Sequence, residues 1–291
     1  MQRRRLGRTG HESSVAILGA AAFARSSPDE TEQAFRSALA AGVNHLDIAP
    51  GYGDAEVLVG PHVPAVRDQL FVAGKSDRSN PDGVKAHLER TLERLGCDHL
   101  DLYQLHGVTD LDVLERRAGA AEVILRARDE GLTRFVGITG HDLGTPRAQL
   151  EALRRYDLDT VMFPVYPRVW ADPVYRTDAE ALLEECAARD VGVMAIKAVA
   201  RRPWGDGEVT GTTWYQPHTD AERITAGIRF TMSTPGVHAF CTPGDLRLLP
   251  LALAAAEELA PLDADSREAA MDESAGEELI FPLSEKARQR G

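Results

Sequence analysis

The chain has 291 residues, of which 43% are hydrophobic and 27% are charged, and its net charge is −12. This length fits one barrel-sized domain with extensions or two smaller domains, and the composition is that of a folded globular protein. So acidic a chain repels a phosphate backbone, and we expect no nucleic-acid partner. No apolar run approaches the roughly 20 residues that span a bilayer, so we expect no membrane association.

The cysteines argue against a disulfide framework and against a metal site. Cys97, Cys186 and Cys241 are far apart and have no Cys-x-x-Cys spacing. An odd number without paired spacing is typical of neither a disulfide scaffold nor a zinc or iron–sulfur module. The arginines at residues 3–5 are not followed by an apolar segment that would form a secretory signal. We therefore expect a cytoplasmic protein without a metal.

Short apolar runs alternate along the chain with longer amphipathic segments. Helix start signals lie between the runs: capping boxes at Ser27-Pro28-Asp29-Glu30 and Thr219-Asp220-Ala221-Glu222, and Asn80-Pro81. Gly96 and Gly192 follow helical stretches and are predicted to cap them. The runs that we predict to be strands are Val15–Leu18, Val43–Ile48, Leu70–Lys75, Leu100–Leu105, Phe135–Thr139, Thr160–Pro164, Val191–Lys197 and Val237–Cys241.

Eight consecutive strand–helix units predict an α/β fold, a parallel sheet closed into a (β/α)8 TIM barrel. The alternative is an open doubly wound sheet, which usually has five to seven strands, so the count favours the barrel. Arg3–Arg5 and Ser13–Leu18 flank Gly7–Gly10 and predict a short N-terminal hairpin. We expect a single domain over residues 1–291, with the barrel at about 14–258 and an acidic C-terminal extension at about 259–291.

Polar residues stand at the ends of three consecutive predicted strands. Asp47 lies at the end of the second strand, Lys75 ends the third, His106 follows the fourth, and Tyr52 lies in the loop after the second. Active sites of such barrels gather at the carboxyl ends of the strands, so we expect these four side chains to meet. Each alone has an ordinary explanation as a turn cap or a rim-packing residue. The combination favours a site.

The four residue types form a coherent acid–base set. An ammonium beside a phenol favours the phenolate, so we expect Lys75 to lower the pKa of Tyr52. Asp47 would keep Lys75 charged, and His106 would donate a hydrogen bond to a carbonyl oxygen. Neither a nucleophile nor a cluster of metal ligands accompanies them in the sequence. The set therefore fits the reduction of a carbonyl group by a hydride that comes from elsewhere.

The sequence resembles the aldo-keto reductase superfamily over nearly its whole length. The most specific stretch is Asp47-Ile48-Ala49-Pro50-Gly51-Tyr52-Gly53, and Arg5–Gly10 and Arg134–His141 also match. The resemblance implies reversible NAD(P)H-dependent reduction of aldehydes and ketones, in which Tyr52 protonates the carbonyl oxygen. It implies a catalytic tetrad of Asp47, Tyr52, Lys75 and His106.

The resemblance also implies where a nicotinamide cofactor binds. Family members commonly hold the carboxamide with Ser-Asn after strand 5 and Gln on strand 6, and stack a Tyr from strand 7 on the ring. Gly244 precedes a helix start suited to a phosphate, and Arg247 matches a position near the adenosine 2′-phosphate. We expect NADPH, with NADH as the alternative. The expected cofactor-binding residues are Thr139, Gly140, Met162, Ile196, Lys197, Gly244 and Arg247.

Two other functions stay open. The departures at Gly140, Met162 and Ile196 are compatible with a cofactor-binding regulatory protein on the same fold. A Tyr52/Lys75 acid–base pair is also compatible with a non-redox lyase or isomerase. Neither the particular carbonyl substrate nor the oligomeric state is specified by the sequence. Aromatic candidates for the mouth of the site are Tyr166, Trp170, Trp204, Trp214 and Tyr215.

Overall fold

The centre of the computed structural model, which describes residues 1–206 and 209–282, is a closed barrel of parallel strands. Neighbouring strands follow the order β12-β3-β4-β5-β6-β7-β8-β9. All eight predicted strands form, so the (β/α)8 barrel is confirmed. They are β3 (Ala16–Gly19), β4 (His45–Asp47), β5 (Phe71–Ser76), β6 (Leu100–Leu105), β7 (Thr133–Thr139), β8 (Thr160–Pro164), β9 (Gly192–Ile196) and β12 (Ala239–Cys241).

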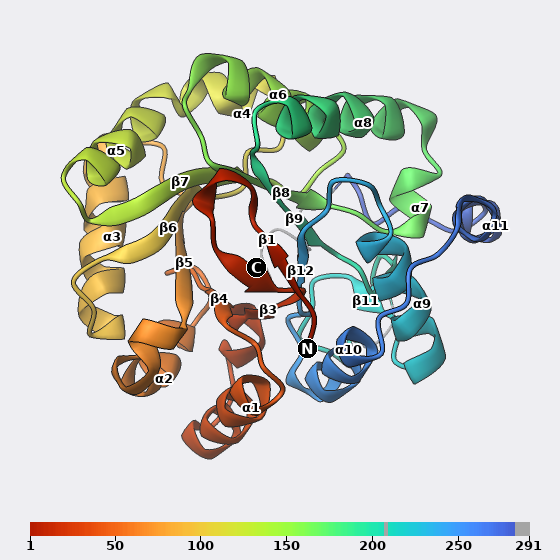
Figure 1. Ribbon diagram of the computed structural model, residues 1–291, viewed down its shortest axis with the longest axis horizontal. Helices are drawn as coiled ribbons and strands as arrows, with labels where there is room; N and C mark the ends of the chain where they lie inside the picture. Colours follow the sequence, from red (N-terminus) through yellow and green to blue (C-terminus); the bar gives the residue numbers. More distant parts are fainter. Residues whose placement is uncertain (207–208, 283–291) are drawn as a thin grey trace.

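Helices surround the barrel and cover its outer face (Figure 1). They are α1 (Pro28–Ala40), α2 (Ala55–Val59), α3 (Pro81–Leu95), α4 (Leu111–Arg116), α5 (Ala118–Asp129), α6 (Thr145–Arg155), α7 (Pro167–Trp170), α8 (Pro173–Ala188), α9 (Ala221–Met232), α10 (Leu249–Glu257) and, outside the ring, α11 (Ala264–Ser274). The short 3-10 helices are η1 (Gly7–Thr9), η2 (Ala20–Phe23), η3 (Gly60–His62), η4 (Pro64–Gln69) and η5 (Leu246–Leu248). No helix among the described residues is long and apolar enough to cross a membrane.

Side-chain caps start the helices. The backbone N–H of Glu30 donates to Ser27 Oγ, and the N–H of Ser27 donates to the Glu30 carboxylate, so the first predicted capping box is confirmed. Asn80 caps α3 with its side-chain oxygen, which accepts the backbone N–H of Gly83. The second predicted box is wrong in register: the N-cap of α9 is Asp220, whose carboxylate accepts the N–H of Arg223.

One of the two predicted C-cap glycines is wrong. Gly96 ends α3 in the left-handed conformation, as predicted. Gly192 is instead the first residue of β9, and Asp190 carries the positive φ, 54°, after α8. Gly192 is needed for space, because a Cβ there would lie 2.8 Å from Cγ of Leu6.

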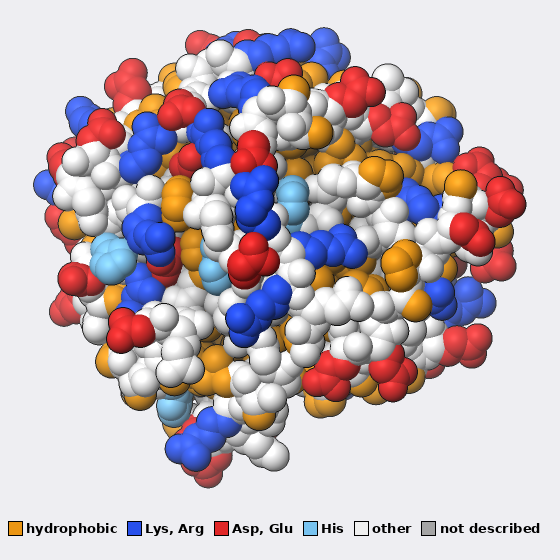
Figure 2. Space-filling model, in the orientation of Figure 1, with side chains coloured by type: hydrophobic (Ala, Val, Ile, Leu, Met, Phe, Trp, Pro, Cys, Tyr) orange, Lys and Arg blue, Asp and Glu red, His pale blue; other side chains and the backbone are white. Residues whose placement is uncertain are grey.

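A short antiparallel hairpin closes the amino end of the barrel. β1 (Arg3–Arg5) pairs with β2 (Glu12–Ser14), and the hairpin crosses the barrel opening in Figure 1. Leu6 is fully buried in the interior barrel cluster. The hairpin is confirmed, but its second strand is shorter than predicted because Ala16 starts the first barrel strand. Figure 2 shows acidic and basic side chains interspersed over this closed end.

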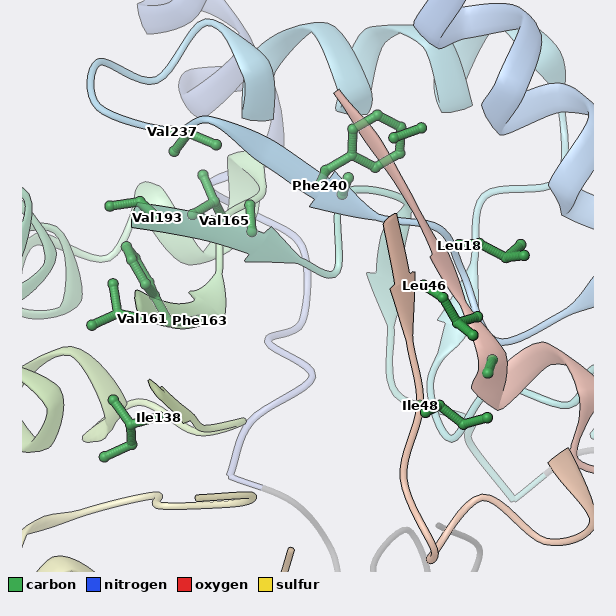
Figure 3. Packing of buried hydrophobic residues seen from close by; sticks show 14 of the residues in the cluster. Leu18, Leu46, Ile48, Ile138, Val161, Phe163, Val165, Val193, Val237 and Phe240 are labelled. Atoms are coloured by element: carbon green, nitrogen blue, oxygen red, sulfur yellow. The ribbon is translucent and has the colours of Figure 1, made fainter. Parts of the chain in front are cut away.

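Alternation along the strands separates an interior core from an outer core. Ile17 belongs to the interior cluster and its neighbour Leu18 to the outer one, which Figure 3 shows in part. In β5, Phe71 and Ala73 belong to the interior cluster, and Lys75 is the next residue on the same face. The interior stack of this strand therefore ends in an ammonium at the carboxyl end of the barrel.

The C-terminal extension lies partly on the surface. The helix α11 contacts α7, and its acidic residues are exposed. Ile280 and Phe281 are buried, and the ring of Phe281 lies 5.9 Å from that of Trp214. The extension thus reaches a residue of the cavity wall described below. The final residues of the predicted extension, 283–291, lie outside the described residues.

Candidate active site

Asp47, Lys75 and Tyr52 form one hydrogen-bonded row at the carboxyl end of the barrel. Asp47 ends β4 and Lys75 lies in β5, and both side chains are almost fully buried. The ammonium of Lys75 donates to Oδ1 of Asp47 and to Oη of Tyr52, the latter over 3.3 Å. The row leads from the barrel interior to a phenol in the loop after β4.

The Asp47–Lys75 pair holds a positive charge behind the phenol. Burial is the largest single influence on the pKa of Lys75 and acts to lower it, but Asp47 together with Tyr52 and Cys241 raises it above its ordinary value, so Lys75 stays charged. Without a carboxylate beside it, a lysine so buried would tend to lose its proton. Gln104 lies opposite Lys75 in the β5–β6 ladder, and its amide favours the ionised form of Asp47.

Tyr52 keeps its proton at neutral pH. Burial raises the pKa of Tyr52 above its ordinary value, and Lys75 opposes this rise only in part. The expectation that Lys75 brings this pKa below its ordinary value is therefore wrong for the free protein, because burial outweighs the ammonium. A protonated phenol beside a fixed ammonium is a proton donor whose conjugate base is stabilised as it forms.

His106 follows β6 and contacts both the phenol and a second histidine. Its ring meets the ring of Tyr52 edge to face, with centroids 5.7 Å apart. Its Nε2 lies 3.0 Å from Nε2 of His141, which follows β7. Burial, helped by Lys75 and Lys197, lowers the pKa of both imidazoles, so both are neutral, and one ring donates to the other.

His141 was missed as a site residue by the sequence reasoning. It directly follows Gly140, at the carboxyl end of β7, the position at which the other polar site residues occur. This position at the carboxyl end of a strand is the feature of the sequence that could have identified His141 as a site residue. Its contact with His106 was not foreseeable, because both residues lie beyond the ends of their strands, where alternation along a strand no longer fixes the direction of a side chain.

Arg117 fixes the loop that carries His106. The backbone N–H of His106 donates to the carbonyl of Ser76 over 2.8 Å. The guanidinium of Arg117 donates to the carbonyl of His106 and, over 2.7 Å, to that of Asp77. The loops after β5 and β6 are therefore held together next to the site.

A cavity of about 740 Å³ opens at these residues. This volume lies in the usual range for sites that bind small molecules and cofactors. Lys75, Thr139 and Gly140 are absent from its wall within residues 1–206 and 209–282. That part of the chain also contains no group of three or more His, Cys, Asp or Glu residues placed to hold a metal. The predicted site residues in the wall are Asp47, Tyr52, His106, Met162, Ile196, Lys197, Gly244 and Arg247.

Comparison with known proteins identifies the family. The model of the Aldo/keto reductase family matches residues 16–262. The chain belongs to this family. An aldo-keto reductase of Strobilurus tenacellus is 31% identical over 211 residues, 68% of this chain and 57% of that protein. A 6-dehydroglucose reductase of Novosphingobium aromaticivorans is 27% identical over 256 residues, 74% of this chain and 82% of that protein.

Solved structures agree with the fold. The holo form of an aldo-keto reductase from Bacillus halodurans matches with a TM-score of 0.73 at 20% identity, over 97% of this chain and 99% of that one. A putative aldo-keto reductase from Pseudomonas aeruginosa matches with a TM-score of 0.70 at 24% identity, over 89% and 95%. At these identities the likeness shows the fold alone. The chain spans about 57% of the length of the Strobilurus relative.

In this aldo/keto reductase, Gly140 leaves no room for the asparagine that the family commonly has there. A Cβ at this position would lie 2.1 Å from the carbonyl oxygen of Val108 and 2.5 Å from Cγ2 of Thr145. The neighbouring Thr139 is fully buried, and its hydroxyl has no hydrogen-bond partner among the described residues. Within residues 1–206 and 209–282, neither Thr139 nor Gly140 lines the cavity.

Gly140→Ala is expected to destabilise the reductase by roughly 1–3 kcal/mol, because the added methyl group displaces backbone atoms. Chemical denaturation measures the change in the free energy of unfolding. Gly276→Ala is the matched control, because a Cβ there meets nothing within 4 Å. Equal stability of the two variants would contradict the close approach at Gly140.

Arg247 is already engaged at the predicted phosphate end. Its guanidinium donates to the carboxylate of Asp245 over 2.9 and 2.6 Å and to the carbonyl of Thr210 over 2.7 Å. The hydroxyl of Thr212 donates to the carbonyl of Gly244 over 2.7 Å. The segment around Thr212 is thereby attached to the loop after β12.

The predicted aromatic mouth is correct in part. Trp214 and Tyr215 lie in the cavity wall. Tyr166 and Trp170 are instead buried in the outer core, where they pack against apolar residues. Trp204 donates to the carbonyl of Thr213 over 2.7 Å and is absent from the wall within the described part of the chain. Two of the five candidates therefore face the cavity.

Proposed function

We propose that this aldo/keto reductase reduces an aldehyde or ketone by hydride transfer from a nicotinamide cofactor, with Tyr52 as the general acid. The observation that carries the proposal is the hydrogen-bonded row from Asp47 through Lys75 to Tyr52, which ends in the cavity wall. It combines a protonated donor with a fixed positive charge behind it. A donor of this kind suits an oxygen that gains negative charge as the reaction proceeds.

A bound nicotinamide supplies the hydride to the carbonyl carbon. As the new C–H bond forms, the π electron pair of the carbonyl moves to its oxygen, and the Tyr52 hydroxyl gives that oxygen its proton. The resulting phenolate pairs with Lys75, which Asp47 holds in place. His106, whose ring contacts the phenol, would exchange its hydrogen bond with His141 for an N–H hydrogen bond to the carbonyl oxygen and so orient it.

We propose NADPH as the cofactor and NADH as the second candidate. The residues that would hold it are Gly244 and Arg247, which lie in the cavity wall, whereas the buried Thr139 lies behind that wall. Arg247 favours a 2′-phosphate, because its side chain is 66% exposed and carries a full charge. Asp245 neutralises part of that charge and repels a phosphate. We therefore expect only a modest preference for NADPH.

Arg247→Ala is expected to weaken NADPH binding roughly 5- to 20-fold and NADH binding less than about 2-fold, because only NADPH carries the 2′-phosphate. Isothermal titration calorimetry measures both dissociation constants. Arg36→Ala is the control, because Arg36 is an exposed arginine paired with Glu32 on α1. An equal effect on both cofactors would show that Arg247 does not select between them.

The proposed function is tested by supplying purified protein with NADPH and a panel of aldehydes and ketones. We expect oxidation of the cofactor that matches formation of the alcohol. Tight cofactor binding without reduction of any carbonyl would favour a regulatory protein, and turnover without a change in nicotinamide absorbance would favour a lyase or isomerase. Because Cys97, Cys186 and Cys241 are all free thiols, we propose the cytoplasm as the site of the reaction.

A further inference from the structure

Lys197 is a cation without a counter-charge in the cavity wall. It follows β9 and is partly exposed to the cavity. Its ammonium lies 3.9 Å from the centre of the Trp214 ring and 5.2 Å from that of Tyr215. Within residues 1–206 and 209–282 this ammonium makes no hydrogen bond and no ion pair. A cation held over aromatic faces is available to an anion from the cavity side.

The electrostatic neighbours of Lys197 belong to the reaction centre. The charged and titratable groups that act on Lys197 are Cys241 and Lys75. Asp245 and Arg247, at the phosphate end, act on each other, and Lys197 is not among the groups that shift them. Lys197 also helps to lower the pKa of His106 and of His141, so its charge acts on the reaction centre.

Contacts between rings lead from Lys197 to the phenol. The Trp214 ring beneath the ammonium meets His141 edge to face, with centroids 6.3 Å apart. His141 is hydrogen-bonded to His106, whose ring contacts Tyr52. These contacts form a continuous row of rings from Tyr52 to Lys197, and both of these residues line the same cavity.

The charge of Lys197 is unmatched, whereas that of Lys75 is matched by Asp47. Burial raises the pKa of the Cys241 thiol, which is therefore neutral at pH 7. Burial also lowers the pKa of Lys197 to about 7, as expected for a cation that lacks a partner. Below about pH 7 the reaction centre thus carries one uncompensated positive charge, which an anionic ligand would stabilise.

We propose that Lys197 is a subsite for a carboxylate of the substrate, so that the reductase acts on carbonyl compounds that carry an acid group. The inference rests on the proposed carbonyl reduction and names its substrate class. Trp214 and Tyr215 form the apolar wall along which the carbon skeleton of such a substrate lies. The sequence predicts Lys197 to bind the cofactor, whose phosphates are a second source of negative charge, and the experiment below distinguishes the two.

The test compares acids with their methyl esters: 2-, 3- and 4-carboxybenzaldehyde and the corresponding esters. Wild type is expected to prefer at least one of the acids. Lys197→Gln should lower kcat/KM for that acid roughly 10- to 100-fold, mainly through KM, and change the ester less than about 2-fold. Lys197→Arg keeps the charge and should restore most of the preference. Lys85→Gln is the control, because Lys85 is exposed and paired with Glu89.

The pH dependence gives a second readout of the same subsite. Lys197 is protonated below about pH 7, so kcat/KM for the acid should fall as pH rises from 6 to 9, while kcat/KM for the ester stays level. The directions of their own pKa shifts keep the groups around Lys197 in one charge state over this range: Lys75, Tyr52, His106, His141, Tyr215 and Cys241. A parallel fall for acid and ester would overturn the assignment.

Calorimetry separates failure of this inference from failure of the proposed function. The dissociation constant of NADPH should agree within about 2-fold between wild type and Lys197→Gln. If instead NADPH binds 10-fold more weakly to the variant, and kcat/KM falls equally for acids and esters, Lys197 belongs to the cofactor site and the proposal is overturned. If wild type reduces no carbonyl at all, the proposed function fails. Binding of 4-methylbenzoate, with and without NADPH, then decides the subsite: binding that Lys197→Gln abolishes supports it, and equal or absent binding to both proteins overturns it.

Discussion

Tyr52→Phe is expected to lower kcat for carbonyl reduction by roughly 100-fold or more, because the substitution removes the proton donor. The dissociation constant of NADPH should change less than about 2-fold, since the phenyl ring can keep its contact with His106. Steady-state kinetics and calorimetry on the same preparation measure the two quantities. A large loss of turnover with unchanged cofactor binding is the signature of a lost acid.

The matched control for this substitution is Tyr156→Phe. Tyr156 follows α6 and packs at the edge of the outer core, so its hydroxyl should be irrelevant to turnover. Full activity of Tyr156→Phe and loss in Tyr52→Phe would assign the effect to the phenol in the cavity wall. Retention of wild-type kcat in Tyr52→Phe would remove Tyr52 from the chemistry.

Lys75→Met is expected to lower the free energy of unfolding by about 3–5 kcal/mol, because it leaves the carboxylate of Asp47 buried without its cation. It should also lower kcat at least roughly 100-fold, since no positive charge remains to stabilise the phenolate of Tyr52. Chemical denaturation and steady-state kinetics measure the two effects. Methionine approximates the length of the lysine side chain, so the change is mainly one of charge.

The double variant Asp47→Asn/Lys75→Met separates stability from catalysis. Removing both charges should recover most of the lost stability, because no uncompensated buried charge remains. Turnover should stay low, because the ammonium is still missing. A double variant that regains full turnover, or a Lys75→Met protein as stable as wild type, would show that the ion pair does not have the role described here.

The barrel was predictable because its strands are local features of the sequence. Each apolar run is bounded by turn residues, and β6 and β8 form over the residues predicted for them. The inward direction of Asp47 and Lys75 follows from alternation along a strand, so their meeting at one end of the barrel was predictable as well. These inferences need only a strand count and a period of two.

Features that depend on burial or on distant contacts were not predictable from the sequence. Burial decides the direction of the pKa shift of Tyr52, and the depth of a side chain is unknown until the barrel closes. The pairing of His106 with His141 and the hydrogen bond from Arg247 to the carbonyl of Thr210 depend on how loops are placed in space. Which of the five aromatic candidates lie in the core and which line the cavity also depends on how the loops are placed.

Transfer of deuterium from NADPH labelled at C4 of the nicotinamide tests the central claim most directly. The reductase is incubated with the labelled cofactor and a carbonyl compound that it reduces, and the alcohol is analysed by mass spectrometry and NMR. We expect one deuterium on the carbinol carbon for each NADPH consumed, and a rate reduced at least roughly 100-fold in Tyr52→Phe. Alcohol formed without deuterium on that carbon, or at the same rate in the variant, would contradict a direct hydride transfer completed by a proton from Tyr52.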